Sequence, residues 1–345
     1  MKAYWSKIKK TAAELGVTAL LLLTILAASG CAEGNEGWEE DGRLKVVTTI
    51  FPYYDFARQV AGDRIDLRLA VPAGMDSHSF EPTPADMRLI QEADLLISNG
   101  GEMEHWLSEV LEAIDAPDLE KITMMDYVET FEEILVEGME ETAHSHDHDH
   151  DHDHEHVDSL GDDGHEEEIE YDEHIWTSPK NAMVIVEEIR DKLTQMDPDG
   201  ASVYEENAEV YLEKLSRLDQ EFEQVAADEK RNMIIIGGKF PFRYLAEAYG
   251  FEYRAAFSGC STDTEPSART IAYLIDRVKE YDIPVVYYLE LSSTRVAEII
   301  GEETGADILL LHSCHNVTRR EFDAGVTYLE LMEQNVENLR KGLDE

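Results

Sequence analysis

The chain has 345 residues, enough for two ordinary domains with a sizeable core, and its formal net charge is −46. So acidic a surface repels nucleic acid and anionic lipid headgroups and attracts cations, which argues against a nucleic-acid-binding protein. Much of this charge is local, because residues 129–173 contain 20 carboxylates and no Lys or Arg.

Residues 1–31 have the pattern of an export signal. Four Lys residues precede the apolar run Val17–Ala28, which is too short to span a bilayer comfortably, and small residues lead into Cys31. We therefore predict a lipoprotein signal peptide, with Cys31 lipidated and holding the protein at the outer face of the cell membrane. A plain signal peptide is the alternative. Residues 32–43 then form a tether rich in Gly, Glu and Asn.

The rest of the chain alternates strand-like and helix-like stretches in two sets, with one long helical stretch between them. In the first set we predict strands at Leu44–Ile50, Ile65–Val71 and Leu95–Ser98 and helices at Tyr53–Val60, Pro84–Ala93, Glu102–Ile114 and Pro179–Leu193. The long helix is predicted at Ala201–Asp228, with an apolar stripe of Tyr204, Val210, Tyr211, Leu215, Leu218 and Phe222.

The second set repeats the alternation. We predict strands at Met233–Ile236, Glu252–Ala256, Val285–Leu289 and Asp307–Leu311 and helices at Phe242–Tyr249, Ser267–Lys279, Thr294–Thr304 and Tyr328–Leu343. Strand–helix repetition with short links indicates parallel sheets covered by helices. We therefore predict an α/β protein of two lobes, each a parallel sheet flanked by helices, at residues 44–200 and 229–345, joined by one long helix at residues 201–228.

Residues 139–173, within the first lobe, form a loop rich in His and acidic residues. Its centre, HSHDHDHDHDHEH, carries the seven imidazoles of His144, His146, His148, His150, His152, His154 and His156. A neutral imidazole is a good ligand for zinc, copper or nickel, and the alternating carboxylates add attraction for cations. The run has no apolar residue to bury, so we predict a solvated loop that gathers metal. The alternative is an acidic low-complexity loop that picks up metal incidentally.

Three other histidines stand where an α/β protein presents its ligands. His78 lies in a Gly-containing loop after a predicted strand, and His174 lies at the edge of the acidic loop, just before a helix. His312 directly follows the apolar run Ile308–Leu311. Because open parallel sheets bind ligands at the carboxyl ends of their strands, we predict that these three histidines hold a metal ion in the crevice.

The motifs around these residues resemble a known family. The segments GMDSHSFEPTPADM, SNGGEMEHWL and DEHIWTSPKNAMVIVEEI are similar to successive signatures of the zinc/manganese substrate-binding lipoproteins of ABC transporters, and the resemblance extends from about Leu44 to Leu343. FPFRY and LHSCHN are similar to motifs of a Gram-positive subgroup, and many zinc-binding members carry a His-rich insertion. The resemblance implies a metal between the two lobes, with His78 and His174 as ligands of the first lobe. It also implies a monomer that delivers its metal to an ABC permease and its ATPase.

The second lobe departs from the family pattern. Lys239 stands nearest to the place of the usual third ligand, and lysine is a poor ligand at neutral pH, so that ligand cannot be carried over. The usual Asp after the last strand aligns with His312, and nearby candidates to complete the shell are Glu265, Cys314 and His315. Glu265 is favoured because Glu-Pro-Ser should place it just before a helix that starts at the strand ends. The predicted shell is His78, His174, His312 and Glu265.

Zinc is the predicted metal. It prefers tetrahedral nitrogen, sulfur and carboxylate ligands, whereas manganese and calcium prefer oxygen-rich sites of higher coordination number. Copper would bind such a site more tightly, so geometry and supply must decide between copper and zinc.

Two cysteines, Cys260 and Cys314, remain after Cys31 is lipidated. An even pair in an exported protein predicts a disulfide. The alternatives are a zinc thiolate and two unpaired thiols.

The predicted function is the extracytoplasmic substrate-binding component of an ABC importer, which captures Zn²⁺ and passes it to a permease. We predict no enzymatic activity, because the sequence has no HExxH spacing and no Ser or Cys nucleophile beside a candidate base. The alternatives are a manganese-binding homologue, a surface adhesin or metal buffer, and a secreted zinc enzyme.

Overall fold

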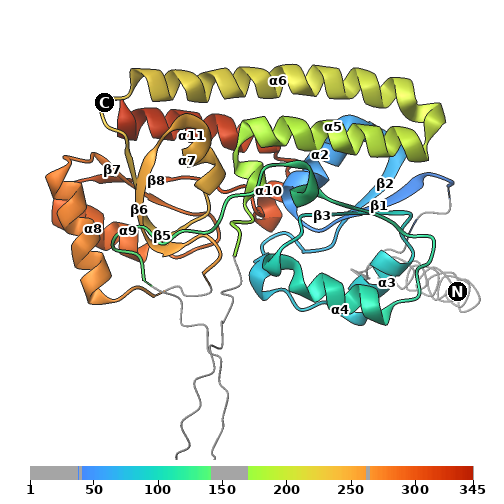
Figure 1. Cartoon of the computed structure of the whole chain (residues 1–345), viewed down its shortest axis with the longest axis horizontal. Helices are drawn as coiled ribbons and strands as arrows, with labels where there is room; N and C mark the ends of the chain where they lie inside the picture. The colour runs from blue at the N-terminus through green and yellow to red at the C-terminus, as the bar shows by residue number, and fades with distance from the viewer. Residues whose placement is uncertain (1–37, 39–40, 141–169, 262–264, 345) are drawn as a thin grey trace, which may run out of the picture. The chain divides into compact units, whose positions relative to one another are not determined.

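Two four-stranded parallel sheets form the framework of the protein in the computed structural model, which describes residues 38, 41–140, 170–261 and 265–344 (Figure 1). The first sheet has the order β2-β1-β3-β4 and the second the order β6-β5-β7-β8, and every pairing is parallel. The strands are β1 Leu44–Thr48, β2 Ile65–Leu69, β3 Leu95–Ser98, β4 Glu120–Thr123, β5 Met233–Phe240, β6 Glu252–Ser258, β7 Val285–Tyr288 and β8 Asp307–Leu310. The predicted α/β class with two lobes is confirmed.

Helices cover both faces of each sheet because alternate strand residues point to opposite faces. In β1, Val46 packs into a core with α2 and α5, whereas Val47 packs into a second core with α3 and α4. The helices are α2 Phe51–Ala61, α3 Pro84–Gln91, α4 His105–Ala113, α5 Pro179–Met196, α6 Ala201–Asp228, α7 Arg243–Tyr249, α8 Ala268–Glu280, α9 Arg295–Thr304, α10 Arg319–Asp323 and α11 Tyr328–Leu343. The predicted start of α3 is confirmed, since Thr83 and Asp86 form a capping box ahead of it.

The long helix α6 has 28 residues, so it is about 42 Å long at 1.5 Å per residue. It contacts α5 and α2 of the first lobe and α11 and α7 of the second, as Figure 1 shows. Its buried residues recur every three or four positions and are Tyr204, Ala208, Tyr211, Leu215, Leu218, Phe222 and Val225. Val210, which we predicted in this stripe, is exposed.

A continuous core and a buried carboxylate fix the two lobes against each other. The largest apolar cluster contains Tyr53 and Trp176 of the first lobe together with Tyr328 of the second. Asp55 on α2 is fully buried and accepts hydrogen bonds from Arg58 and from the backbone nitrogen of Tyr328 at 2.7 Å. These contacts hold the carboxyl ends of the two sheets in a defined relation.

Two elements were not predicted from the sequence. Strand β4 has a single buried residue, Ile122, and helix α10 has none, so neither carries a clear apolar pattern. In the part of the chain that the structure describes, no helix combines the length and the apolar character that crossing a membrane requires. The predicted signal peptide, Cys31 and the His-rich run His144–His156 lie outside the described residues.

Candidate metal centre

His78 is presented by a short 3-10 helix, Ser77–Ser79, in the loop after β2. Asp76 caps this helix by accepting a hydrogen bond from the His78 backbone nitrogen at 2.9 Å. The loop is also held from the second lobe, because the Asn316 side chain donates to the carbonyl oxygens of Pro72 at 2.9 Å and Met75 at 2.8 Å. His78 is thereby positioned by contacts from both lobes.

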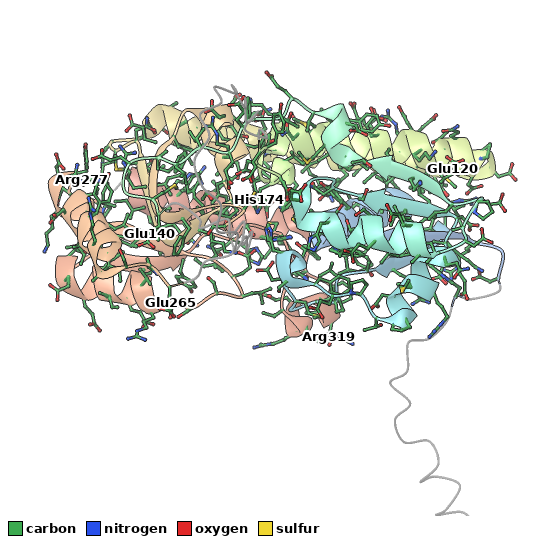
Figure 2. The ribbon with its side chains drawn as sticks, turned by 60° about the horizontal axis from the view of Figure 1, so that its bottom comes forward. Glu120, Glu140, His174, Glu265, Arg277 and Arg319 are labelled. Carbon is green, nitrogen blue, oxygen red and sulfur yellow. The ribbon has the colours of Figure 1, made fainter. Side chains whose placement is uncertain are left out.

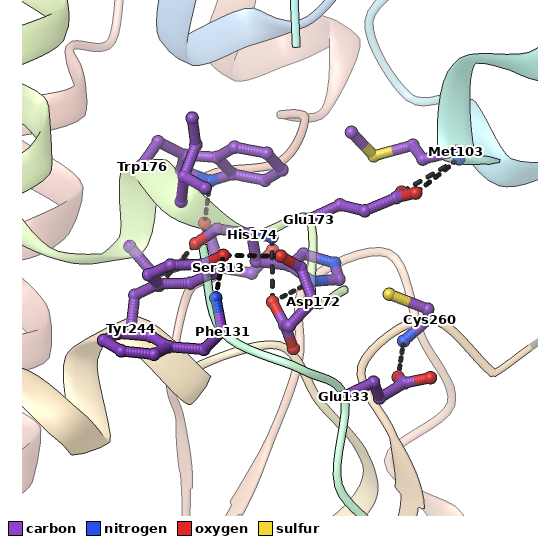
Figure 3. A network of polar contacts seen from close by, with 12 residues as sticks. Met103, Phe131, Glu133, Asp172, Glu173, His174, Trp176, Tyr244, Cys260 and Ser313 are labelled. Atoms are coloured by element: carbon purple, nitrogen blue, oxygen red, sulfur yellow. Dashed lines mark hydrogen bonds and ion pairs between the residues drawn. The ribbon is translucent and has the colours of Figure 1, made fainter. Parts of the chain in front are cut away.

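His174 lies at the root of the His-rich loop, and its side chain is only 2% exposed. Asp172 Oδ1 accepts from the His174 backbone nitrogen at 2.9 Å and lies 3.2 Å from the ring nitrogen Nδ1 (Figure 3). The Tyr244 hydroxyl donates to the Asp172 carbonyl oxygen at 2.7 Å, which anchors this turn to the second lobe. Because Asp172 holds Nδ1, the other ring nitrogen of His174 is left for a metal ion.

The third histidine at this place is His315, in the loop after β8. Its backbone nitrogen donates to Ser313 Oγ at 3.2 Å, and its Nε2 is hydrogen-bonded to the Ser77 hydroxyl. The Trp176 indole donates to the Ser313 carbonyl oxygen at 2.8 Å, as Figure 3 shows. The loop is therefore held against the first lobe, next to the other two histidines.

One ligating atom from each of His78, His174 and His315 lies within 4.8 Å of the others. The ring centroids are 5.9 Å apart for His78–His174, 5.5 Å for His78–His315 and 5.9 Å for His174–His315. Three imidazoles from three distant segments thus face a common point between the lobes, and Figure 2 shows His174 in this central region. Three protein ligands with an open fourth position form an arrangement that zinc accepts.

The three rings differ in their protonation. Burial, followed by the charge of neighbouring His174, lowers the pKa of His78 to about 4. Burial and the other two rings lower the pKa of His315 well below its usual value. Burial also acts to lower the pKa of His174, but the charge and hydrogen bond of Asp172, with the charges of Glu173 and Glu133, outweigh it and the pKa is raised. His78 and His315 are therefore the rings that give up a proton most easily, and His174 is the ring at which a metal ion competes most with a proton.

The structure corrects the prediction for His312, which does not lie with His78 and His174. Its Nδ1 accepts from the Cys314 backbone nitrogen at 2.9 Å and lies 3.5 Å from a Glu290 oxygen. Its backbone nitrogen donates to Asn335 at 2.7 Å. The chain then turns through Cys314, whose φ of 60° lies in the left-handed region, and presents His315 instead. Within the motif LHSCHN it is therefore His315, and not His312, that lies beside His78 and His174.

The structure also does not bring Glu265 to the three histidines. It is exposed just before α8, as Figure 2 shows, and it belongs to neither group of candidate metal ligands among the described residues. Lys239 at the end of β5 is near the site, because its charge contributes to the lowered pKa of both His78 and His315. The positively charged side chain of Lys239 therefore stands near the position of the usual third ligand.

The predicted disulfide is wrong, because Cys260 and Cys314 are both free. Cys314 is fully buried in the main core, and burial raises the pKa of its thiol. Cys260 lies on the loop after β6, where its ligating atom is within 4.8 Å of those of Asp172 and His174. Burial, with the charges of Asp172 and Glu133, raises the pKa of the Cys260 thiol. Asp172 was not among the predicted site residues, although its spacing of two residues from His174 is the signal that could have shown it.

Residues 46–342 match the model of the family described as "Zinc-uptake complex component A periplasmic". The chain is 33% identical over 327 residues to the zinc-binding lipoprotein AdcA of Streptococcus pneumoniae, a match that covers 95% of this chain and 61% of that protein. The chain therefore spans about three fifths of the length of this streptococcal relative.

Two further proteins match over most of the length of both chains. The high-affinity zinc uptake system protein ZnuA of Bacillus subtilis is 31% identical over 335 residues, with 97% of this chain and 98% of that protein covered. The crystal structure of the Zn(II)-bound ZnuA-like domain of Streptococcus pneumoniae AdcA superposes with a TM-score of 0.68 at 30% identity, covering 88% of this chain and 100% of that one. With the family model matched from residue 46 to residue 342, the chain belongs to the family of zinc-uptake complex component A.

Proposed function

We propose that this protein is the extracytoplasmic substrate-binding component of a zinc uptake system, which captures Zn²⁺ between its lobes and delivers it to a membrane permease driven by an ATPase. The observation that carries the proposal is the convergence of His78, His174 and His315 from both lobes on one point. The family match supports it, because the family is one of uptake components rather than enzymes.

Zinc as the cargo is supported by the chemistry of the three donors. Three imidazole nitrogens suit zinc, whereas manganese prefers carboxylate, carbonyl and water oxygens. The relatives named above are described as zinc-binding or zinc-uptake proteins. The donors are brought together by polar contacts among the protein's own residues, and such contacts favour a site that is preorganised for its cargo.

The remaining segments fit export and delivery. We assign residues 1–31 to a lipoprotein signal peptide and Cys31 to the lipid anchor, with residues 32–43 as the tether. Lobes at residues 44–200 and 229–345, joined by the helix at 201–228, then form a monomeric receptor outside the cell membrane. A lipid anchor keeps the loaded receptor close to the permease, because membrane attachment raises the effective concentration of both partners.

The His-rich segment is proposed to gather zinc for the cleft. Residues 141–169 contain eight of the 13 histidines of the chain. The chain that follows the segment runs along the first lobe just before His174, since the Glu133 backbone nitrogen donates to the Glu170 carbonyl oxygen at 2.9 Å and Glu132 bridges Tyr171. Deleting residues 141–169 should lower the zinc stoichiometry and leave the tight site intact. Loss of tight binding on deletion would instead make the segment part of the cleft site.

Thermal unfolding with and without zinc tests the proposed function. Ligand at a thousand times its dissociation constant adds about 4 kcal/mol to folding stability, so zinc should raise the melting temperature clearly. His78→Ala should remove most of this rise, whereas His105→Ala, at an exposed position at the start of α4, should retain it. A melting temperature that zinc does not change would refute a zinc receptor.

A further inference from the structure

A second group of metal-ligating side chains overlaps the three-histidine group. One ligating atom from each of Asp172, His174 and Cys260 lies within 4.8 Å of the others. This group shares only His174 with the first, and it offers oxygen, nitrogen and sulfur where the first offers nitrogen alone. Such a mixed donor set suits zinc and other thiophilic ions and is poor for manganese.

The Asp172 carboxylate is arranged so that one oxygen holds His174 and the other is left for a ligand. Oδ1 accepts from the His174 backbone nitrogen and lies 3.2 Å from Nδ1, as Figure 3 shows. Both of these contacts are made by Oδ1, and the Asp172 side chain is only 3% exposed. A Cβ atom added at Gly259 would lie 3.1 Å from Oδ2 and 3.1 Å from His174 Cε1. The bare backbone at Gly259 thus lets the Cys260 loop approach both side chains.

The same segment of the first lobe positions Asp172 and Cys260. The Cys260 backbone nitrogen donates to Glu133 Oε1 at 2.9 Å, a contact drawn in Figure 3. The Asp172 backbone nitrogen donates to the carbonyl oxygen of Phe131, two residues before Glu133, also at 2.9 Å. The Cys260 thiol is free and is not part of a disulfide. A sulfur donor therefore stands beside the cleft with its backbone fixed and its thiol outside any disulfide.

We propose that Asp172, His174 and Cys260 form a second, sulfur-containing metal seat, which overlaps the three-histidine seat at His174 and makes the cleft selective for thiophilic divalent ions over Mn²⁺. On binding, the Cys260 S–H bond breaks, its proton leaves to water, and the sulfur bonds to the metal as a thiolate. The thiolate and the carboxylate together balance the charge of a divalent ion. This inference rests on the proposed function, because it concerns the same zinc and shares His174 with the site described above.

X-ray absorption at the zinc edge tests the second seat on the full chain loaded with one equivalent of zinc. Because the two seats share His174 and cannot both be filled at once, zinc distributed between them should give a partial sulfur contribution at about 2.3 Å. Nitrogen and oxygen neighbours of both seats should appear at about 2.0–2.1 Å. Cys260→Ser should lose the sulfur neighbour. Cys314→Ser is the matched control, because that thiol lies in the core, and it should keep the wild-type spectrum.

Competition between metals gives a second readout. Cys260→Ser should weaken Cd²⁺ binding by at least about tenfold and leave Mn²⁺ binding unchanged. Tenfold is the lower end of the loss in metal affinity when a residue that supports a metal ligand is removed. Zinc bound by the wild type without a sulfur neighbour, or a sulfur neighbour that persists in Cys260→Ser, would overturn the second seat alone. A wild-type chain that binds no zinc would overturn the proposed function as well.

Discussion

The two lobes supply the metal centre in different ways. In the first lobe, His78 and His174 stand where their motifs predict, one after β2 and one before α5. In the second lobe, the histidine nearest the end of β8, His312, has its ring against Glu290, and His315 faces the other two. The first-lobe histidines of the candidate site could be predicted from their local sequence, whereas the second-lobe histidine could not.

The difference lies in what turns each side chain. His78 is oriented by Asp76 and His174 by Asp172, and each of these carboxylates lies only two residues away. The orientation of both histidines is therefore set by local sequence. His315 is oriented by the left-handed turn at Cys314 and by contacts to Ser77, which lies 238 residues earlier. Position at the end of a strand predicts a functional loop, but tertiary contacts decide which of its side chains enters the site.

Each lobe nevertheless has a carboxylate that supports a loop beside the site. Glu104 accepts from the backbone nitrogens of Asn99 and Gly100, both at 2.9 Å, at the end of β3. Glu290, after β7, accepts from the backbone nitrogen of Ser313 at 2.8 Å. Asn99 in turn donates to the carbonyl oxygen of Glu173 at 3.0 Å, beside His174. Acceptors of this kind fix loops whose backbone amides have no strand partner.

The largest expected effect comes from removing the second-lobe histidine of the candidate site, His315. His315→Ala removes one of three nitrogen donors, so zinc affinity should fall by more than about 100-fold, beyond what the loss of a supporting partner costs. Isothermal titration against a competing chelator measures the change, with His105→Ala as the control. A His315→Ala protein that binds zinc as tightly as the wild type would remove His315 from the site.

The buried carboxylate of the first lobe predicts a pH effect on stability. Burial raises the pKa of Glu104 from its ordinary value to about 7, so the folded state favours the protonated acid. Stability from this group is therefore complete below a pH of about 4.5 and is lost as the pH rises through about 7. Glu104→Gln should flatten this loss, which amounts to at most about 3.5 kcal/mol at about 1.4 kcal/mol per pH unit.

Denaturant unfolding of metal-free protein at several pH values measures that change. Glu109→Gln, at an exposed position on α4, provides the control and should keep the wild-type pH profile. If Glu104→Gln also kept the wild-type profile, the Glu104 carboxylate would not be the group responsible.

The smallest effect is expected at His312. His312→Ala leaves the buried Cys314 backbone nitrogen without its acceptor, which should cost about 1–2 kcal/mol of unfolding free energy. Zinc affinity should change by less than about tenfold, or about 1.4 kcal/mol, because His312 belongs to neither group of candidate ligands and supports the loop instead. Equal losses of zinc binding in His312→Ala and His315→Ala would show that the distinction drawn between them is wrong.

The strongly patterned parts of the fold were predictable, and the weakly patterned parts were not. Helix α6 could be predicted because its apolar residues recur at helical spacing. Strand β4 buries only Ile122, so its sequence has no periodic apolar pattern. At the site, Glu265 was chosen for its place before α8, but it is exposed there. Spacing along the chain also could not tell that Cys314 turns into the core while Cys260 stays beside His174. Both errors concern the direction of a side chain in a loop.

Anomalous diffraction at the zinc edge from crystals of the zinc-loaded protein tests the central claim most directly. The expected result is a zinc peak with nitrogen atoms of His78, His174 and His315 at about 2.0–2.1 Å. A zinc peak beside this one, with Asp172, His174 and Cys260 as its neighbours, would show zinc in the second seat. A peak held by His312 or Glu265, with His315 turned away, would contradict the account.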